Sequence, residues 1–489
     1  MEEDDVTIRE QNFHSQVREY IICFLLFAVL YIVSYFIITR YKRKADDHED
    51  EDALVNRISL YLCTFTLAVS AGAVLLLPFS IISNEILLSF PKNYYIQWLN
   101  GSLIHGLWNL MSLFSNLCLF MLMPFAYFFL ESEGFAGSKK GIKARILETF
   151  VMLFLLGLLI LGIVWVASAL IDNDAASMES LYDLWEFYLP YLYSCISLMG
   201  GLLLLLCTPV GLSRMFTVVG QLLVKPTILE DLDEQIYCIH LQEEALQRRL
   251  NGMLSHSQCS TLHVDKELDN VRSLKNKLER RKKASAWEKN LVYPIVMLIL
   301  LAGTTISVLL VAFNILYLLV DETAMPKGSK ERGIGSASLS TFGCVGAALE
   351  IILMFYLMVS SVVGFYSLRF FEGLTPRKDD TTMTTIIGCC VSILVLSSAL
   401  PVMSRTLGIT RFDLLGDFGR FNWLGNFYIV LSYNLLFAVV TTLCLVRKFT
   451  SAVREELLKA LGLDKLHLSN STRDPETAKH SANGHQKSL

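Results

Sequence analysis

Nine apolar stretches, each long enough to cross a lipid bilayer, constrain this chain more than any other feature of its sequence. A helix that crosses about 30 Å of hydrocarbon needs roughly 20 mostly apolar residues. Lipid offers no hydrogen-bond partner for a free backbone group, so helices are the expected spanning form. The stretches cover residues 20–39, 59–83, 103–130, 147–171, 187–208, 291–320, 339–366, 385–404 and 424–446. We therefore predict an all-α fold, a polytopic membrane bundle of nine transmembrane helices.

The composition agrees with this class. Only 18% of the residues are charged, whereas soluble domains carry about 25%, and the mean hydropathy is +0.47. One long polar insert divides the apolar stretches into two groups. The predicted organisation is helices one to five in 1–208, a cytosolic helical hairpin in 209–290, helices six to nine in 291–446, and a cytosolic, mostly disordered tail in 447–489.

The hairpin is predicted from two apolar repeats that flank a turn-rich segment. The segment reads "NGMLSHSQCST" and begins at Asn251. Spacings of three and four residues recur on both sides of it, with one break at Glu243. The repeat positions are Leu229, Leu232, Ile236, Ile239, Leu246 and Leu250 before the turn, and Val264, Leu268, Val271, Leu274 and Leu278 after it. A self-contained antiparallel hairpin and a dimerising coiled coil both fit helices of this length.

The distribution of basic residues predicts the sidedness of the bundle. Of the 42 Lys and Arg residues, 33 fall on the side that carries the polar insert and the C-terminal tail. Basic residues favour the cytoplasmic side, so we expect the N-terminus outside and the C-terminus in the cytosol. None of the 11 cysteines falls in a predicted outer loop, which excludes a disulfide-stapled ectodomain. The plasma membrane is the favoured location, and an internal membrane is the alternative.

Glu350 is the first candidate ligand-binding residue. It lies eleven positions after Leu339, the start of the seventh stretch. At about 1.5 Å per residue this is about 16 Å, near the bilayer midplane. An ionisable group at that depth is costly and suggests a pathway or ligand site. The alternative is a protonated side chain bonded to a neighbouring helix, with Asn109, Asn116 and Asn434 as candidate partners.

The connector before the ninth stretch, "TRFDLLGDFGRFNWLGN", interleaves charges with aromatic rings. It is predicted to lie on the outer face, where aromatic side chains enter the headgroup zone. It is either an interfacial cap on the bundle or a lid that contacts a ligand. Its candidate ligand-binding residues are Asp413, Asp417, Arg420 and Trp423.

Two further candidate sites lie near span ends. A basic cluster with a tryptophan precedes the sixth stretch and suits anionic lipid headgroups, or it is an ordinary inner-face anchor. Its members are Arg280, Arg281, Lys282, Lys283 and Trp287. Asn100 begins an Asn-Gly-Ser glycosylation pattern, close to the start of the third stretch.

The sequence lacks the common catalytic motifs. It contains no nucleotide-binding glycine–lysine loop, no H-E-x-x-H and no C-x-x-C pair, and its nine His residues form no ligand pattern. We expect no enzyme activity, no cofactor, no metal site and no nucleic-acid partner.

Several segments carry a resemblance to a known family. "LLLPFSIISNEILLSFPKNYYIQWLNGSLIHGLWNL", "SLYDLWEFYLPYLYSCIS" and "SRTLGITRFDLLGDFGRFNWLGNFYIV" resemble the LIMR family, which includes the lipocalin-interacting membrane receptor. The resemblance extends over almost the whole chain and implies a nine-span receptor. One branch is linked to uptake of a lipocalin, a carrier of small apolar molecules, and a more distant branch to lysosomal cobalamin export. The family supplies no catalytic residues.

Three functional hypotheses follow. The first is a multi-pass receptor that binds a lipocalin-like extracellular protein, or a sterol or other lipid, and couples to an unidentified cytosolic protein. The second is a lipid or small-molecule transporter with an intramembrane site near Glu350. The third is a membrane scaffold that forms a homodimer. In each case membrane lipids surround the bundle.

Overall fold

The described part of the molecule is helical. The structure is a computed structural model, and it describes residues 2–43, 50–132, 141–171, 179–224, 227–253, 258–287, 291–320, 343–409 and 427–460. Its α-helices are α1 (Glu2–Tyr41), α2 (Asp50–Ser89), α3 (Tyr94–Trp98), α4 (His105–Leu117), α5 (Met123–Glu131), α6 (Ile142–Ile171), α7 (Glu179–Val224), α8 (Thr227–Met253), α9 (Gln258–Trp287), α10 (Tyr293–Val320), α11 (Cys344–Ser367), α12 (Met383–Thr406) and α13 (Phe427–Ala460). Short π-helices at Leu99–Ile104 and Cys118–Leu122 connect α3 to α4 and α4 to α5, and a 3-10 helix, η6 (Arg369–Leu374), follows α11. No strand occurs in these ranges, which confirms the all-α class.

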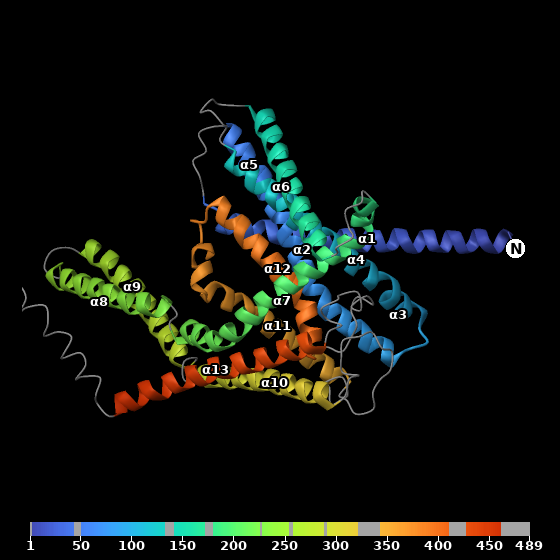
Figure 1. The fold of residues 1–489 in the computed structure, drawn as a ribbon. Coiled ribbons are helices and arrows are strands. Elements are labelled where there is room, and N and C mark those ends of the chain that lie inside the picture. The colour runs from blue at the N-terminus through green and yellow to red at the C-terminus, as the bar shows by residue number, and fades with distance from the viewer. Residues whose placement is uncertain are drawn as a thin grey trace, which may run out of the picture.

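Nine helical segments within the described ranges are long and apolar enough to cross a membrane. They are α1, α2, the run from α3 to α5, α6, α7, α10, α11, α12 and α13. Each coincides with most of the described part of one predicted stretch, so the predicted polytopic membrane bundle is confirmed. The N-terminus and α3 lie at one end of the molecule, and α8, α9 and the last turns of α13 lie at the other (Figure 1). We call these the α3 end and the hairpin end.

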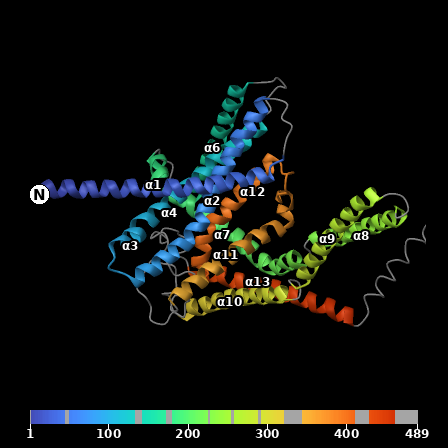
Figure 2. The ribbon, with the colours of Figure 1, turned by 180° about the vertical axis from the view of Figure 1, so that it is seen from behind.

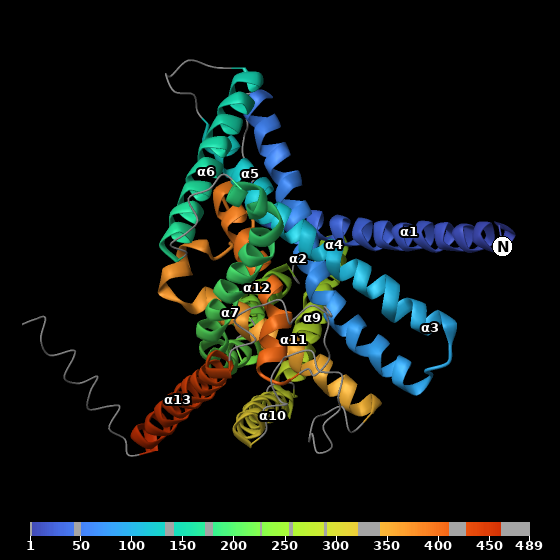
Figure 3. The same ribbon diagram turned by 45° about the vertical axis from the view of Figure 1, so that its right-hand side comes forward.

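Helices of similar apolarity differ greatly in burial. In α12, 67% of the most apolar window is buried inside the protein, against 6% in α6. The sequence of α6 presents Leu, Ile, Val and Phe on all sides, whereas α12 is rich in Ser, Thr and Cys. Lipid is as apolar as leucine, so small and hydroxyl-bearing residues decide which helices pack closely. Accordingly α6 and the first half of α1 lie at the periphery (Figure 3).

The closest helix contact joins α7 to α11 through two glycines. A Cβ atom added to Gly211 would lie 1.6 Å from the Ser360 carbonyl oxygen, and one added to Gly364 would lie 1.9 Å from the Cys207 carbonyl oxygen. Only glycine allows the backbones to approach this closely. We call this contact the α7–α11 crossing.

The same helix, α7, also holds α12 and α13. A Cβ atom on Gly200 would lie 2.6 Å from the Cβ atom of Ala399 in α12. The Tyr433 hydroxyl of α13 donates a 2.9 Å hydrogen bond to the Gly201 carbonyl oxygen. Figure 2 shows α7, α11 and α12 in the middle of the molecule, with α10 and α13 packed together along one side. The centre of the bundle is therefore organised around α7.

Two of the helices that extend beyond the predicted spans cross a predicted segment boundary. The predicted boundary at residue 208 falls inside α7, which continues to Val224 because residues 210–224 remain mostly apolar. The hairpin therefore begins at Thr227 rather than at residue 209. Likewise α13 continues through the predicted start of the tail to Ala460. Residues 461–489 of the tail lie outside the described part of the chain.

Candidate functional site

Glu350 is buried, but it lies nearer to one helix end than predicted. Gly343 is the N-cap of α11 and adopts a φ of 65°, so the helix begins at Cys344. Glu350 is therefore about 9 Å from the helix start at about 1.5 Å per residue, and not at the middle of the helix. Its side chain is 8% exposed. It shares the buried face of α11 with the apolar residues Ala347 and Met354.

One proposed partner of Glu350 belongs to a different network. Asn434 of α13 donates one hydrogen bond to the Thr406 carbonyl oxygen at 3.0 Å and another to the Val430 carbonyl oxygen at 2.9 Å. Its own side-chain oxygen accepts a 3.0 Å bond from Asn314 of α10. A primary amide has only two N–H donors, and both are used. Asn434 therefore cannot donate to Glu350 in this arrangement.

The end of α12 explains why two asparagines meet there. Gly408 adopts a φ of 73°, and its N–H binds the Arg405 carbonyl oxygen while the Ile409 N–H binds that of Ser404. This is the Schellman arrangement that commonly ends helices at glycine. It leaves the Thr406 carbonyl oxygen to be satisfied by side chains, and Asn314 and Asn434 both donate to it.

A second polar cluster lies at the α3 end. The Glu19 carboxylate of α1 accepts hydrogen bonds from the Trp98 indole at 2.9 Å and the Ser102 hydroxyl at 2.6 Å. The Arg18 guanidinium lies 4.0 Å from the centre of the Trp98 ring, a cation–π contact. Ser102 is the hydroxyl residue of the predicted glycosylation pattern, and Asn100 itself lies in the π-helix that follows α3. The structure does not test whether Asn100 is modified.

The predicted outer connector lies outside the described residues. Asp413, Asp417, Arg420 and Trp423 therefore remain sequence-based candidates only. The described chain stops just before them at Ile409, which is 3% exposed.

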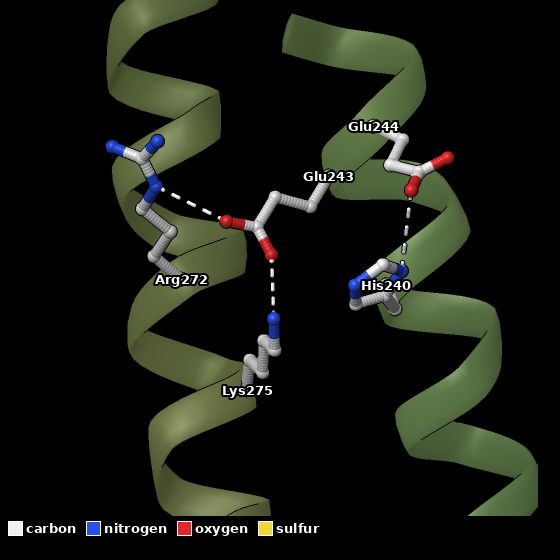
Figure 4. Close-up of polar contacts among 5 residues, drawn as sticks. All are labelled: His240, Glu243, Glu244, Arg272 and Lys275. Carbon is white, nitrogen blue, oxygen red and sulfur yellow. Dashed lines mark hydrogen bonds and ion pairs between the residues drawn. The ribbon is translucent and has the colours of Figure 1, made fainter.

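An ionic cluster joins the two hairpin helices (Figure 4). Glu243 of α8 binds Lys275 at 2.9 Å and Arg272 at 3.2 Å, both from α9. These hydrogen bonds, led by the one from Lys275, lower the pKa of the Glu243 carboxyl. The next residue on α8, Glu244, faces away toward His240 of its own helix, at 3.8 Å.

The cluster accounts for the break in the apolar repeat. Glu243 occupies a repeat position of α8, and Lys275 continues the spacing of Val264, Leu268 and Val271 on α9. Leu274, predicted to face the partner helix, is instead 49% exposed. The matching break at Lys275 was the sequence signal that could have identified the ion pair.

The basic cluster near the end of α9 is placed in part. Arg280 is exposed on the helix, and the backbone of Arg281, Lys282, Lys283 and Trp287 continues as helix. The side-chain positions of these four residues lie outside the description. Within the described ranges no group of His, Cys, Asp and Glu residues could hold a metal ion.

Comparison with known proteins identifies the relatives of this chain. It matches the family model described as "LMBR1-like membrane protein" over residues 19–285 and 259–449. It is 86% identical to limb region 1 protein homolog of Gallus gallus, with 100% of both chains covered. It is 84% identical to the Homo sapiens homolog, with 100% of this chain and 99% of the other covered.

A more distant relative covers nearly as much of the chain. Protein LMBR1L of Mus musculus is 63% identical, with 95% of each chain covered. No solved structure matches. The family resemblance inferred from the quoted segments is confirmed, and the chain belongs to the LMBR1-like membrane protein family.

Proposed function

We propose that this protein is a multi-pass receptor that binds its ligand at the α3 end and transmits the event to the hairpin end. The observation that carries the proposal is the length of α7. It is a 46-residue helix, about 69 Å long at about 1.5 Å per residue, more than twice the hydrocarbon thickness of about 30 Å. It ends two residues before the hairpin. A displacement at its first turns would therefore reach the base of α8.

The α3 end offers a surface suited to an apolar-ligand carrier. Phe90, Tyr94 and Tyr95 are 64%, 66% and 67% exposed around the turn that precedes α3. Exposed aromatic side chains are enriched at protein–protein contacts and at membrane interfaces. Together with the family resemblance, they support a lipocalin-like protein, or its sterol or lipid cargo, as the ligand. The bias of basic residues toward the hairpin end supports an outer location for α3 and a cytosolic one for the hairpin.

A binding assay with matched variants tests the proposal. The purified protein in lipid nanodiscs would be exposed to lipocalins with and without bound cargo. We expect the Tyr94→Ala/Tyr95→Ala double variant to lose binding, and Tyr237→Ala on α8, where the tyrosine is 65% exposed, to retain it. Equal binding by both variants, or no binding by the wild-type protein, would contradict a lipocalin receptor.

Transmission of ligand binding from the α3 end to the hairpin end can be measured separately. Cys238 is an exposed native thiol on α8, so its rate of maleimide labelling, followed by peptide mass spectrometry, reports on the hairpin. We expect ligand to change this rate in the wild-type protein and not in the Tyr94→Ala/Tyr95→Ala variant. An unchanged labelling rate of Cys238 at saturating ligand would contradict transmission from the α3 end to the hairpin end.

Transport is the second candidate function, and the burial of Glu350 supports it. An ionisable side chain inside a membrane bundle marks many substrate and proton pathways. Against it, α7 and α12 continue as helices through Pro209 and Pro401, whereas transporter sites are often built from broken helices. Ligand uptake into vesicles that is unaffected by Glu350→Gln would exclude Glu350 from such a site.

A homodimeric scaffold is the third candidate. Tyr237 and Leu241, one turn apart on α8, are 65% and 48% exposed. Self-association in a mild detergent would be compared before and after replacement of both residues by serine. An unchanged oligomeric state would exclude this face as the dimer contact.

A further inference from the structure

A half-buried lysine, which forms no ion pair with an acidic side chain among the described residues, lies at the hairpin end of the bundle. Lys448 of α13 donates a hydrogen bond to the Thr217 hydroxyl of α7. Among the described residues, this hydrogen bond is the polar contact that the Lys448 side chain makes. Lys448 lies about 32 Å along α13 from Phe427 at about 1.5 Å per residue, so it reaches the opposite boundary of a hydrocarbon layer of about 30 Å. An ammonium group that is partly removed from water needs a compensating charge.

The described side chains of the three helices around Lys448 supply no such charge at its level. In α7 no Asp or Glu occurs after Glu186, α10 contains none, and α13 contains none before Glu455. These three helices pack on one another. Near Lys448 they add positive charge instead. Arg214 lies one turn before Thr217, on the same side of α7, and is exposed, and Arg447 precedes Lys448 and is also exposed.

Apolar rings adjoin these cations at the same level. Phe216 of α7 and Phe449 of α13 pack edge to face with their ring centres 5.6 Å apart. One helical turn further along α7, a Cβ atom on Gly220 would lie 3.7 Å from the Tyr293 hydroxyl at the start of α10. Cations next to aromatic side chains at a membrane boundary match a lipid, which presents a charged headgroup above an apolar chain.

We propose that Arg214, Lys448 and Arg447, with the Phe216–Phe449 pair, bind the phosphate of an anionic phospholipid at the hairpin end. Phosphate oxygens accept the N–H donors that Lys448 does not give to Thr217, and the Arg214 guanidinium donates to the same phosphate group. The acyl chains lie along the two phenylalanine rings. This site is separate from the basic cluster at Arg280–Lys283 on α9 and does not depend on the receptor proposal.

The experiment measures lipid-dependent stability of the full-length protein in a mild detergent. The unfolding midpoint would be recorded against increasing short-chain phosphatidylserine, phosphatidylcholine or inorganic phosphate. Ligand that binds only the folded state raises the midpoint, and the rise grows with the logarithm of the ligand concentration relative to its Kd. We expect the midpoint to rise steadily with the logarithm of the phosphatidylserine concentration above its Kd, and to rise little with phosphatidylcholine. Equal effects of the two lipids, or stabilisation by inorganic phosphate without a preference for phosphatidylserine, would overturn the proposal.

Matched variants assign the effect to the site. We expect Lys448→Gln and Arg214→Gln each to weaken the apparent affinity for phosphatidylserine about fivefold, the effect of one basic residue near an anionic surface. Lys448→Arg keeps the charge and should bind within about twofold of wild type. Thr217→Val removes the hydroxyl but no charge, and Lys92→Gln removes a charge at the α3 end, so both should bind as wild type does. A wild-type affinity in Lys448→Gln, or an equal loss in Thr217→Val, would contradict the assignment.

Discussion

The α7–α11 crossing and the α8–α9 hairpin are both pairs of packed helices, but different interactions hold them. At the crossing, Gly211 and Gly364 bring the two backbones together, and the hydroxyls of Thr208 and Ser361 lie 2.7 Å apart. In the hairpin, leucines such as Leu268 fill the contact and Glu243 pairs with two cations. The difference follows from what surrounds each pair, which is lipid for the membrane helices and water for the hairpin.

In water, burial of an apolar side chain gains about 25 cal/mol per Å², so leucines suffice to bring α8 and α9 together. In lipid this gain disappears, because a leucine contacts equally apolar atoms whether it faces a helix or an acyl chain. Close backbone contact and hydrogen bonds must then select the partner. The membrane helices of this protein are therefore sorted by their small and polar residues, and the hairpin helices by their apolar ones.

The largest expected effect is at the crossing. Gly364→Leu places a side chain where even a Cβ atom would lie 1.9 Å from a carbonyl oxygen and 2.8 Å from the Gly211 nitrogen. Backbone cannot yield as a flexible side chain does, so we expect a loss of about 3 kcal/mol or more in the free energy of unfolding. Denaturant titration in detergent measures it. The control is Gly157→Leu in α6, where nothing lies within 4 Å of the added atom. A loss as large in the control would show that glycine position does not matter.

The asparagine network should contribute the next largest effect. Asn434→Leu removes two donors and leaves the Thr406 carbonyl oxygen with Asn314 alone. It also removes the side-chain oxygen that accepts a hydrogen bond from Asn314, so an Asn314 N–H loses its partner. We expect a loss of about 1–3 kcal/mol in the free energy of unfolding, the cost of leaving such a polar group unsatisfied. The Asn314→Leu and Asn434→Leu changes should be non-additive, because they share one acceptor. Additive losses would mean that the two side chains act independently. Asn109→Leu, at an exposed position, serves as the control.

In the hairpin the ion pair should matter less, and both partners can be replaced together. Glu243 and Lys275 are 16% and 23% exposed, so water screens the pair only in part. We expect Glu243→Leu alone to destabilise the hairpin by about 0.5–1 kcal/mol. The Glu243→Leu/Lys275→Leu variant restores the apolar repeat and should be at least as stable as wild type. Hydrogen exchange of peptides from 227–287 measures both. If the double variant is less stable than Glu243→Leu alone, the ion pair stabilises the hairpin more than two apolar side chains do at the same positions.

The smallest effect is a pH dependence of the same pair. The hydrogen bonds from Lys275 and Arg272 lower the pKa of Glu243 in the folded hairpin below its unfolded value of about 4.3. The stabilisation of the folded hairpin by the ionised Glu243 carboxylate is therefore fully present above about pH 5, and it is lost as the pH falls through the lowered pKa. Hydrogen exchange, corrected for intrinsic rates, should show faster opening of α8 and α9 in acid. Glu243→Gln should abolish this component, and an identical acid response in that variant would assign it to other groups.

The sequence was sufficient for the spans and the hairpin, because both depend on local spacing of apolar residues. It did not reveal which distant helices pair. Nothing near Gly211 marks Gly364 as its neighbour, and nothing near Asn314 marks Asn434. The helix α11 begins at Cys344, five residues after the predicted start of the span, so Glu350 lies nearer to the helix start than the sequence indicated. Its depth in the bilayer stays a prediction. The predicted outer residues from Asp413 to Trp423 lie outside the described chain, so they stay predictions.

Disulfide trapping across the α7–α11 crossing tests the packing account most directly. Cysteines would replace Thr208 and Ser361, whose hydroxyl oxygens are 2.7 Å apart, and the control would pair a cysteine at Thr217 with the one at Ser361. After mild oxidation of native membranes, peptide mass spectrometry separates these bonds from any formed by Cys207. We predict a high yield of the 208–361 disulfide and little of the 217–361 one. Equal yields, or no bond at 208–361, would contradict the close contact of α7 with α11.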